Sequence, residues 1–428
     1  MADKHVLIIT YYWPPAGGPG VQRWLKFVKY LPEFGIKPIV YCPSNPNYPI
    51  LDKSLSEEVP IDLKIITKPI AEPYRFAKIL SKKSSKTISS GVIPERKKQS
   101  LIERLLLYVR GNYFIPDARK NWVEPSVRFL KNYIQEHAIK TVITTGPPHS
   151  MHLIGMHLKN NLDITWITDF RDPWTTIGYH KALKLTKRAK QKHLRLEKEV
   201  LNTTDNVIVT SDFTKNEFAT KTNTPISVIT NGYDSQSVIV KDKHEDFVIA
   251  HIGSLLSERN PLVLWETLSE LVDENQDFAS KFRLKFIGVV SENIMDTITS
   301  YGLENYLDYV GYVSHEQAII QQKKSQLLLL IEINSEDTKA IIPGKLFEYM
   351  ISETPIIAIG PNDSDVETII KNTNTGNYFK YSEKHKLKAQ LIEFFNSYKK
   401  GRLKTDPIGL QKYSRHSLTK KLAKLIDE

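Results

Sequence analysis

Short apolar runs alternate with longer amphipathic stretches along nearly the whole chain. Such runs predict buried strands of parallel sheets, because these strands are covered on both faces and carry few polar positions. Between the first two runs, apolar side chains recur at positions 21, 24, 25, 28 and 31, a spacing that predicts a helix. The predicted strands cover residues 6–10, 38–41, 64–67, 141–144, 165–168, 207–210, 227–230, 247–252, 284–287, 306–310, 327–331, 355–359 and 377–379.

The alternation of strand and helix predicts the α/β class, with two doubly wound, Rossmann-like domains. A chain of 428 residues is too long for one ordinary core, and the polar stretch 234–245 separates two series of strands. We therefore expect a first domain over 1–233, with a basic insertion at 70–120, and a second domain over 246–404. The remaining stretch, 405–428, predicts a helix that can cross back onto the first domain.

Composition is typical of a soluble globular protein, with 41% hydrophobic and 25% charged residues. No apolar run approaches the roughly 20 residues that a bilayer-spanning helix needs. The N-terminal apolar run lacks the flanks of a signal peptide and is expected to form a strand. A single cysteine, Cys42, excludes an intrachain disulfide and a cysteine zinc site, so we expect a cytoplasmic protein.

Positive charge is concentrated in two segments. The formal net charge is +11, whereas residues 75–110 alone carry +8 and residues 181–198 carry +7. Local basicity of this kind favours a directed contact, such as an anionic membrane surface or a diphosphate-bearing lipid. A solvated helix face explains 181–198 equally well. Nucleic acid is less favoured, because the basic runs lack interleaved aromatic residues and a reading motif.

The most informative stretch is 342–350, which lies between two predicted strands. Gly344 lets a ligand approach the backbone at an expected helix start, where Pro343 suits the first helical position. Lys345 adds a positive charge there, and Glu348 lies one turn on, where a carboxylate can accept two ribose hydroxyls. A diphosphate cradle beside such an acid predicts a nucleotide-sugar site. The alternative is a capped helix whose lysine and glutamate are merely solvated.

A second strand-to-helix turn, residues 251–261, offers further groups for a diphosphate. Ser254 stands at the strand exit, and Arg259 lies near the helix start, where a guanidinium can hold two phosphate oxygens. Gly311 and Val313 follow another strand and can present backbone groups to a base edge. No Asp-x-Asp pair stands in a setting suited to Mg²⁺, so we expect no metal and no cofactor beyond a nucleoside diphosphate sugar as co-substrate.

The glycine- and proline-rich loop 12–23 follows the first predicted strand, at the edge where open α/β sheets bind ligands. Gly17 and Gly18 allow close backbone approach to a substrate, and Arg23 can reach a phosphate. The loop matches neither a Walker motif nor a Gly-x-Gly-x-x-Gly fingerprint. An ordinary turn with packing glycines is the alternative.

Two acids flank an arginine directly after strand 165–168. Asp169, Arg171 and Asp172 would be costly to bury unless they paired or bound a ligand. Arg171 can stabilise a leaving phosphate, and Asp169 or Asp172 can orient a sugar hydroxyl. An internal salt-bridge network is the alternative. His149, in the loop after strand 141–144, is a candidate proton carrier, although a lone loop histidine is more often structural.

The order of these elements resembles glycosyltransferase family 4, the retaining enzymes of the GT-B fold. The resemblance covers nearly the whole chain and rests on four segments: residues 17–18, 231–234, 251–253 and 345–358. It implies two Rossmann-like domains facing a central cleft, with the acceptor on the first and the nucleotide sugar on the second. The implied reaction is metal-independent transfer of a sugar to a hydroxyl, with retained configuration, in cell-surface polysaccharide or glycolipid synthesis.

The chain departs from the family's motifs. By position, Glu348 resembles the second acid of a paired-glutamate motif, the one that binds ribose, whereas Ala340 stands where the first acid is expected. Glu336 is a nearby acid that can substitute from the loop. Arg171-Asp172 stands where the family often has a His-Asp pair.

The family's basic pair over the diphosphate corresponds to Ser254 and Arg259, so one cation is missing or is supplied by Lys345. In this interpretation Arg259, Lys345 and the backbone at Gly344 stabilise the leaving diphosphate. The basic segment 75–110 is expected to dock peripherally on the inner membrane face. Two other functions stay open: a nucleotide-sugar 2-epimerase, which needs no acceptor, and a catalytically weakened binding protein.

Overall fold

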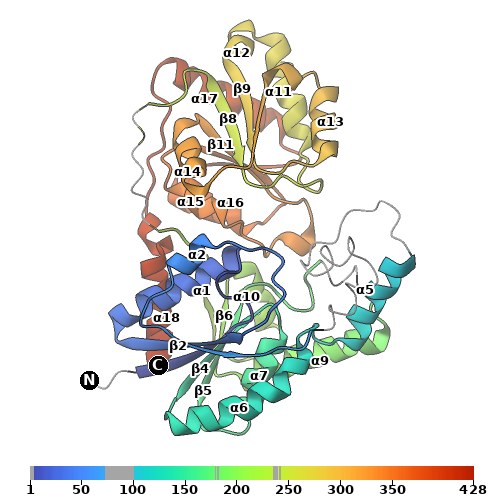
Figure 1. Ribbon diagram of the computed structural model, residues 1–428. Coiled ribbons are helices and arrows are strands. Elements are labelled where there is room, and N and C mark those ends of the chain that lie inside the picture. The colour runs from blue at the N-terminus through green and yellow to red at the C-terminus, as the bar shows by residue number, and fades with distance from the viewer. Residues whose placement is uncertain (1–3, 73–100, 179, 181–182, 235–239, 241) are drawn as a thin grey trace. The chain divides into compact units, whose positions relative to one another are not determined.

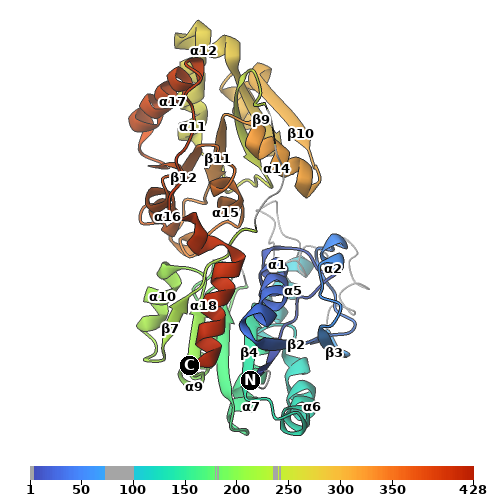
Figure 2. The ribbon, with the colours of Figure 1, turned by 90° about the vertical axis from the view of Figure 1, so that its left-hand side faces the viewer.

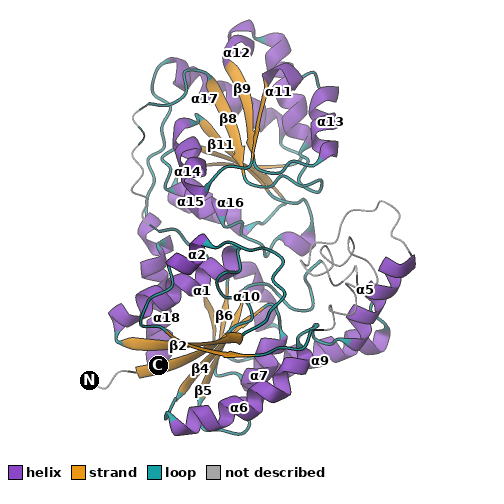
Figure 3. Ribbon diagram, viewed as in Figure 1, coloured by secondary structure: helices purple, strands orange, loops and turns teal. Residues whose placement is uncertain are grey.

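The computed structural model describes residues 4–72, 101–178, 180, 183–234, 240 and 242–428, with the side chains of 101–103 left out. Its contacts divide the chain into unit 1, Met1–Asn231 with Arg415–Glu428, and unit 2, Gly232–Ser414. Each unit has one parallel sheet with helices on both faces (Figures 1 and 3). Most of the predicted basic insertion, and part of the predicted linker over 234–245, lie outside the described residues.

Unit 1 has a seven-stranded sheet in the order β3-β2-β1-β4-β5-β6-β7. Its direction of winding reverses at β1, where Ile9 pairs with Tyr41 of β2 and Thr144 of β4. Because side chains alternate between faces, Leu7 packs with the helices α6 (Val123–Glu136), α7 (Ser150–Lys159) and α9 (Lys187–Thr203). Ile8 packs on the other face, with α1 (Pro19–Tyr30) and α18 (Arg415–Asp427). The strands are β1 Lys4–Ile9, β2 Ile36–Pro43, β3 Lys64–Lys68, β4 Thr141–Gly146, β5 Thr165–Phe170, β6 Asn206–Val209 and β7 Ile226–Val228.

The helices of unit 1 include one from the far end of the sequence. The last helix, α18 (Arg415–Asp427), packs along α1 and buries Leu418, Leu422 and Ile426 (Figure 2). These contacts complete the apolar cover on that face of the sheet. The other helices are α1 Pro19–Tyr30, α2 Ser54–Glu57, α5 Leu101–Tyr113, α6 Val123–Glu136, α7 Ser150–Lys159, α9 Lys187–Thr203 and α10 Asp212–Ala219.

Unit 2 has a six-stranded sheet in the order β10-β9-β8-β11-β12-β13. Helices α11, α12, α13 and α17 pack on one face, and α15 and α16 pack on the other. The strands are β8 Phe247–Ile252, β9 Phe282–Ile287, β10 Leu307–Gly311, β11 Leu327–Ile331, β12 Ile356–Gly360 and β13 Gly376–Lys380. The helices are α11 Leu262–Glu274, α12 Gln276–Lys281, α13 Glu292–Ser300, α14 His315–Lys324, α15 Lys345–Met350, α16 Asp365–Thr373 and α17 Lys384–Lys399.

The predicted strands are confirmed, each with both ends within two residues of the observed bounds. The expected helix start at Pro343 is wrong by two residues, because α15 begins at Lys345 and Gly344 is its N-cap. Pro343 lies in the preceding turn, where its carbonyl accepts a hydrogen bond of 3.0 Å from the backbone N–H of Leu346. None of the helices in the described ranges is long and apolar enough to cross a membrane.

Candidate functional site

Glycines line the carboxyl edge of the unit 2 sheet. Gly253 and Gly288 directly follow β8 and β9, and Gly311 and Gly360 end β10 and β12. A Cβ on Gly288 would lie 2.7 Å from the carbonyl oxygen of Gly253, so only glycine allows these strand ends to approach so closely. The carbonyl of Gly311 accepts a hydrogen bond from the Gly288 N–H at 2.7 Å, and Val313 packs on the core beneath α15. At these strand ends the edge of the sheet therefore presents backbone groups instead of side chains.

Lys345 extends its ammonium to this edge. A Cβ on Gly253 would lie 2.7 Å from Nζ of Lys345, so the glycine leaves the space that the amine occupies. Nδ1 of His251 lies 3.0 Å from the carbonyl of Leu329 and must donate to it, which leaves Nε2 as the acceptor for Lys345 at 3.1 Å. Desolvation, and then repulsion from Arg259, lower the pKa of Lys345 to about 7. A neutral histidine thus positions a lysine that makes no ion pair within the described residues.

The other predicted donor-binding residues lie near Lys345. Arg259 is partly buried, burial lowers its pKa, and its side chain makes no ion pair in the described part of the chain. The charges of Arg259 and Glu348 both act on the pKa of Lys345, which brings the three groups into one electrostatic neighbourhood. Glu348 accepts a hydrogen bond of 3.2 Å from Nε2 of Gln322. Ser254 is exposed at the exit of β8. The candidate site therefore contains the cations Lys345 and Arg259 and the carboxylate of Glu348, beside the glycine-lined edge of the unit 2 sheet.

The two positions considered for the first acid of the paired-glutamate motif, Ala340 and Glu336, differ in exposure. Ala340 is buried, with 4% of its surface exposed. Glu336 has 80% of its side chain exposed, and its carboxylate pairs with Nζ of Lys339 at 2.7 Å. The acid facing solvent from this loop is therefore already paired with a lysine.

Glu332 is a buried acid at this edge that sequence patterns did not identify. It directly follows β11, and only 4% of its surface is exposed. The hydroxyl of Ser364 lies 2.9 and 3.0 Å from its two carboxyl oxygens, and the hydroxyl of Tyr378 lies 2.9 Å from Oε2. Burial raises the pKa of Glu332 to about 7 despite these hydrogen bonds. The only sequence signal was an acid at the exit of a fully apolar strand.

Asp169 and Arg23 form a buried ion pair in unit 1. Nη2 of Arg23 lies 2.8 Å from Oδ1 of Asp169, and the two side chains are 2% and 0% exposed. Asp169 also accepts hydrogen bonds from Trp24 and Thr145, at 2.7 and 2.8 Å. Burial opposes its ionisation, but Arg23 holds the pKa of Asp169 below its ordinary value. Nη1 of Arg23 donates to the carbonyl of Thr230 at 2.7 Å. These contacts favour an anchoring role for both residues over contact with a substrate.

Arg171 and Asp172 follow β5. Nη1 of Arg171 donates to the hydroxyl of Thr145 at 2.8 Å, and Nη2 donates to the carbonyl of Pro147. A Cβ on Gly20 would lie 2.8 Å from Nε of Arg171, so Gly20 leaves room for the guanidinium. Burial raises the pKa of Asp172, although Arg171 opposes this shift. Asp172 is partly exposed and accepts no side-chain hydrogen bond within the described residues.

His149 lies in the core at the start of α7. It is 2% exposed, and its ring stacks on Trp174 with centroids 4.8 Å apart. Neither ring nitrogen has a hydrogen-bond partner in the described structure. Burial, and then the charge of His152, lower the pKa of His149 well below its ordinary value, so the ring is neutral. Asp117 accepts hydrogen bonds from the backbone and the hydroxyl of Ser150, each at 2.8 Å. The burial of the His149 ring favours a packing role for this residue.

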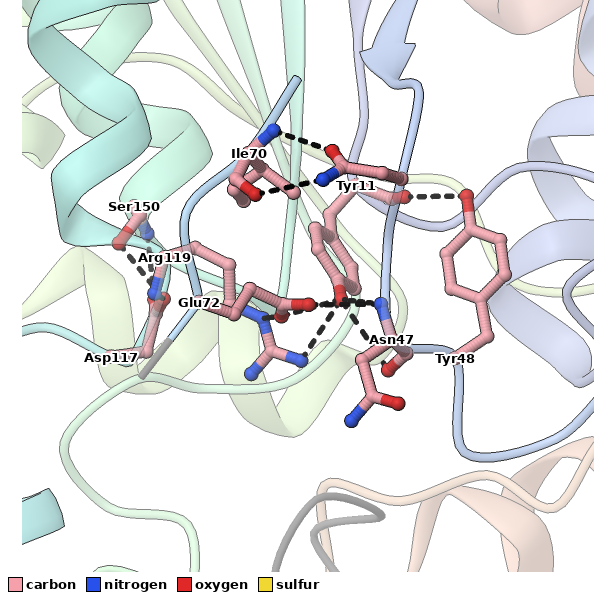
Figure 4. Close-up of polar contacts among 9 residues, drawn as sticks. Tyr11, Asn47, Tyr48, Ile70, Glu72, Asp117, Arg119 and Ser150 are labelled. Atoms are coloured by element: carbon pink, nitrogen blue, oxygen red, sulfur yellow. Dashed lines mark hydrogen bonds and ion pairs between the residues drawn. The ribbon is translucent and has the colours of Figure 1, made fainter. Parts of the chain in front are cut away.

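Residues that follow β1, β2 and β3 form a second polar cluster in unit 1, together with Arg119 from the loop after α5 (Figure 4). Nε of Arg119 lies 3.2 Å from Oε1 of Glu72, and both side chains are 5% exposed. The hydroxyl of Tyr11 donates to Glu72 at 2.7 Å, and the backbone of Asn47 donates to Oε2 of Glu72 at 2.8 Å. The hydroxyl of Tyr48 donates to the carbonyl of Tyr11 at 3.1 Å. Sequence patterns missed this cluster because its members come from separate loops with no shared motif.

The two glycines predicted at the acceptor site differ in their surroundings. The N–H of Gly17 donates to the carbonyl of Ile50 at 3.0 Å, and a Cβ there would lie 2.9 Å from Cγ2 of Ile50. Gly18 is the N-cap of α1 at φ 108°, and nothing lies within 4 Å of its Cβ position. Gly17 therefore serves loop packing, while Gly18 leaves the space beside the start of α1 open.

A family model matches part of the chain, and solved structures share its fold over nearly its whole length. Residues 90–237 match the model of Glycosyltransferase Family 4, and no curated protein sequence matches. A glycosyltransferase from Rickettsia africae is 14% identical, with a TM-score of 0.63 over 99% of this chain and 98% of that one. The lipopolysaccharide outer core galactosyltransferase WaaB, in its apo form, is 15% identical, with a TM-score of 0.59 over 99% and 100%.

Anabaena HepE, in complex with UDP and glucose, is 12% identical, with a TM-score of 0.59 over 99% of both chains. At these identities the solved structures bear on the fold alone. The fold predicted from the sequence agrees with them over the full length of the chain. The predicted resemblance to glycosyltransferase family 4 is thus confirmed over residues 90–237, and the chain as a whole has the GT-B fold.

Proposed function

We propose that the protein is a retaining glycosyltransferase that moves a sugar from a nucleoside diphosphate sugar to a hydroxyl acceptor. The observation that carries this proposal is the pair of cations, Lys345 and Arg259, at the glycine-lined edge of the unit 2 sheet. Lys345 is held by a neutral histidine, and Arg259 makes no ion pair in the described residues. Two such cations suit a diphosphate. The family match and the solved complex of HepE with UDP support the same ligand class.

In the proposed reaction, the acceptor hydroxyl forms a bond to the anomeric carbon as the bond from that carbon to the diphosphate breaks. The hydroxyl proton passes to the departing phosphate oxygen. Negative charge grows on the diphosphate, where Lys345 and Arg259 stabilise it without a metal ion. Glu348 would accept the ribose hydroxyls, and Gln322 orients its carboxylate at 3.2 Å.

Unit 1 would supply the acceptor site, with Asp172 as its principal polar contact. Asp172 is the partly exposed acid after β5, whereas Asp169 is buried and paired. A carboxylate in this position can accept a hydrogen bond from the attacking hydroxyl and orient it. Arg171 would hold Asp172 in place, and Gly18 leaves room beside the start of α1.

The cellular setting that we propose is the inner membrane face, in cell-surface polysaccharide or glycolipid synthesis. The basic segment 75–110 would attract anionic lipid; its residues 75–100 lie outside the described structure. The described surface nearby supports this, because Leu105 and Tyr113 of α5 are 61% and 65% exposed. Helix α9, which contacts α5, exposes the cations Lys187, Arg188, Lys190, Lys192, Arg195 and Lys198. Unchanged binding to anionic liposomes after Lys82, Lys83, Lys97 and Lys98 are replaced by glutamate would refute this docking.

Thermal unfolding with UDP-, GDP- and ADP-sugars, and with the free nucleotides, tests the donor site. A ligand at about 100 times its dissociation constant adds roughly 2.7 kcal/mol to the free energy of unfolding. We expect a shift with one base, lost in Arg259→Ala and Glu348→Ala and kept in Glu336→Ala, whose acid faces solvent. No shift with any nucleotide would contradict the donor assignment. It would favour a catalytically weakened binding protein, because Ala340 and Ser254 stand where the family has an acid and a cation.

Product analysis separates the remaining enzyme classes. A transferase needs an added acceptor, and its product carries the donor's sugar with the same anomeric configuration. A 2-epimerase converts the nucleotide sugar alone. Incubation of the purified protein with the stabilising donor, with and without a saccharide or lipid-linked acceptor, therefore decides between the two. Conversion that is independent of acceptor would overturn the transferase proposal.

A further inference from the structure

Glu332 lies in a buried polar cluster that is built from several elements of unit 2. Its backbone carbonyl accepts a hydrogen bond of 2.7 Å from the hydroxyl of Tyr381. A Cβ on Gly360 would lie 2.4 Å from its Oε2, so the glycine leaves space for the carboxyl group. The titratable and charged groups that act on it are Arg259 from the loop after β8, Asp365 of α16, Tyr378 of β13 and Tyr381 beyond β13.

Counting protons around the carboxyl group shows which charge state fits the geometry. The hydroxyl of Tyr378 lies 2.9 Å from Oε2 of Glu332 and 2.7 Å from the carbonyl of Pro361, but it has one proton to donate. If Glu332 were ionised, one of these oxygen–oxygen contacts would lack a proton. If Oε2 carries a proton, it donates to Tyr378, whose own proton goes to Pro361. Ser364 then donates to Oε1 at 2.9 Å.

The neutral state of Glu332 matters for Arg259. Arg259 lies in the loop after β8, the strand that pairs with β11, and Glu332 directly follows β11. The charges of Glu258 and Glu332 both act on the pKa of Arg259, and Arg259 acts in turn on the pKa of Glu332. Arg259 nonetheless makes no ion pair in the described residues. An ionised carboxylate would offer the guanidinium a partner inside the protein, and this partner would compete with any anion from outside. A protonated carboxyl group offers no such competition.

We propose that Glu332 competes with a nucleoside diphosphate for the guanidinium of Arg259, depending on its own protonation. When Glu332 is protonated, Arg259 is free to bind the diphosphate. When Glu332 is ionised, its carboxylate attracts Arg259 and weakens the binding of the diphosphate. This inference rests on the proposed function, since it takes the diphosphate as the ligand. It makes Glu332 a positioning residue that controls donor affinity without touching the donor. The burial that raises the pKa of Glu332 to about 7 places the change within the physiological range.

Lys345, on whose pKa Arg259 also acts, titrates in this range as well, and its protonation also favours an anion. Wild-type affinity alone therefore cannot assign the effect to Glu332. The difference between wild type and Glu332→Gln does so, because glutamine keeps a donor for Tyr378 and cannot ionise. Lys345 is unchanged in that comparison.

The experiment is isothermal calorimetry of the full-length chain with UDP, GDP and ADP, at pH 6.0 and pH 8.5. For the nucleotide that binds, we expect Glu332→Gln to match the wild type within about twofold at pH 6.0. At pH 8.5 the variant should bind about tenfold more tightly, because most wild-type molecules are then in the ionised, competing state. Glu336→Gln, an exposed acid paired with Lys339, is the matched control and should follow the wild type at both pH values.

Ser364→Ala provides a second variant. It removes a hydrogen bond that lowers the pKa of Glu332, so affinity at pH 8.5 should rise in the same direction. Equal or weaker binding by Glu332→Gln at pH 8.5 would overturn the inference and leave the donor site intact. If no nucleotide binds the wild type at pH 6.0, both the inference and the proposed function are overturned.

Discussion

Gly253 is the residue on which the position of the Lys345 amine depends. Its φ of 115° is costly for any residue with a side chain, and a Cβ would lie 2.7 Å from Nζ. We expect Gly253→Ala to lower the stability by about 1–2 kcal/mol and to weaken nucleotide binding at least tenfold. Calorimetric titration measures the second effect. Gly302→Ala, at φ 69° with nothing within 4 Å, should cost stability and leave binding unchanged; equal binding by both variants would contradict the prediction.

Lys345 should make the stability of the chain depend on pH. Its folded pKa of about 7 lies below the ordinary 10.5, so the unfolded chain binds more protons between these values. The contribution of Lys345 to the free energy of unfolding therefore rises as the pH increases from 7 toward 10.5, and it is lowest below pH 7. We expect Lys345→Met to gain roughly 2 kcal/mol more over the wild type at pH 6 than at pH 9, after allowance for partial exposure. Urea titrations at both pH values test this, and an equal gain at both would contradict it.

At the scale of elements, helix α1 is fixed to the sheet of unit 1 by the buried pair of Arg23 and Asp169. Asp169→Asn would leave the guanidinium without a counter-charge, which costs about 3 kcal/mol in buried pairs. The low pKa of Asp169 means that this contribution persists above the ordinary carboxyl range and is lost as acid protonates the folded state. Denaturant midpoints at pH 7 measure the loss. Asp427→Asn, whose pair with Lys4 is exposed, is the control and should change stability by less than about 0.5 kcal/mol.

The strands of both sheets were predictable because buried parallel strands are continuous apolar runs, such as 327–331. Part of the site followed from the same logic, since Arg259 stands in the turn after a predicted strand and Lys345 lies between two predicted strands. The start of α15 was misplaced because a proline is acceptable in both a turn and a first helical turn. Glu332 was not predictable, because its hydrogen-bond partners Ser364 and Tyr378 lie 32 and 46 positions away. Sequence spacing does not encode such tertiary contacts.

At the scale of the whole molecule, α18 makes unit 1 depend on the end of the chain. Removal of 415–428 would expose the face of α1 that now packs against Leu418, Leu422 and Ile426. At about 1.5–3 kcal/mol for each buried side chain, the loss is comparable with the whole stability of a domain. Calorimetric scans of the truncated chain should show the unit 1 transition lowered or lost. The transition that responds to nucleotide, assigned to unit 2, should remain; loss of both together would contradict this independence.

The discontinuity of unit 1 has a consequence for its synthesis on the ribosome. The chain between the two parts of unit 1 is 183 residues long, since unit 2 spans positions 232 to 414. At about 5–20 residues per second, the first 231 residues wait roughly 10–40 seconds for α18 to emerge. During that interval unit 2, which lies between the two parts of unit 1 in the sequence, can fold before unit 1 is complete. The nascent N-terminal half meanwhile presents an uncovered apolar face, which makes it a client for chaperones until its final helix arrives.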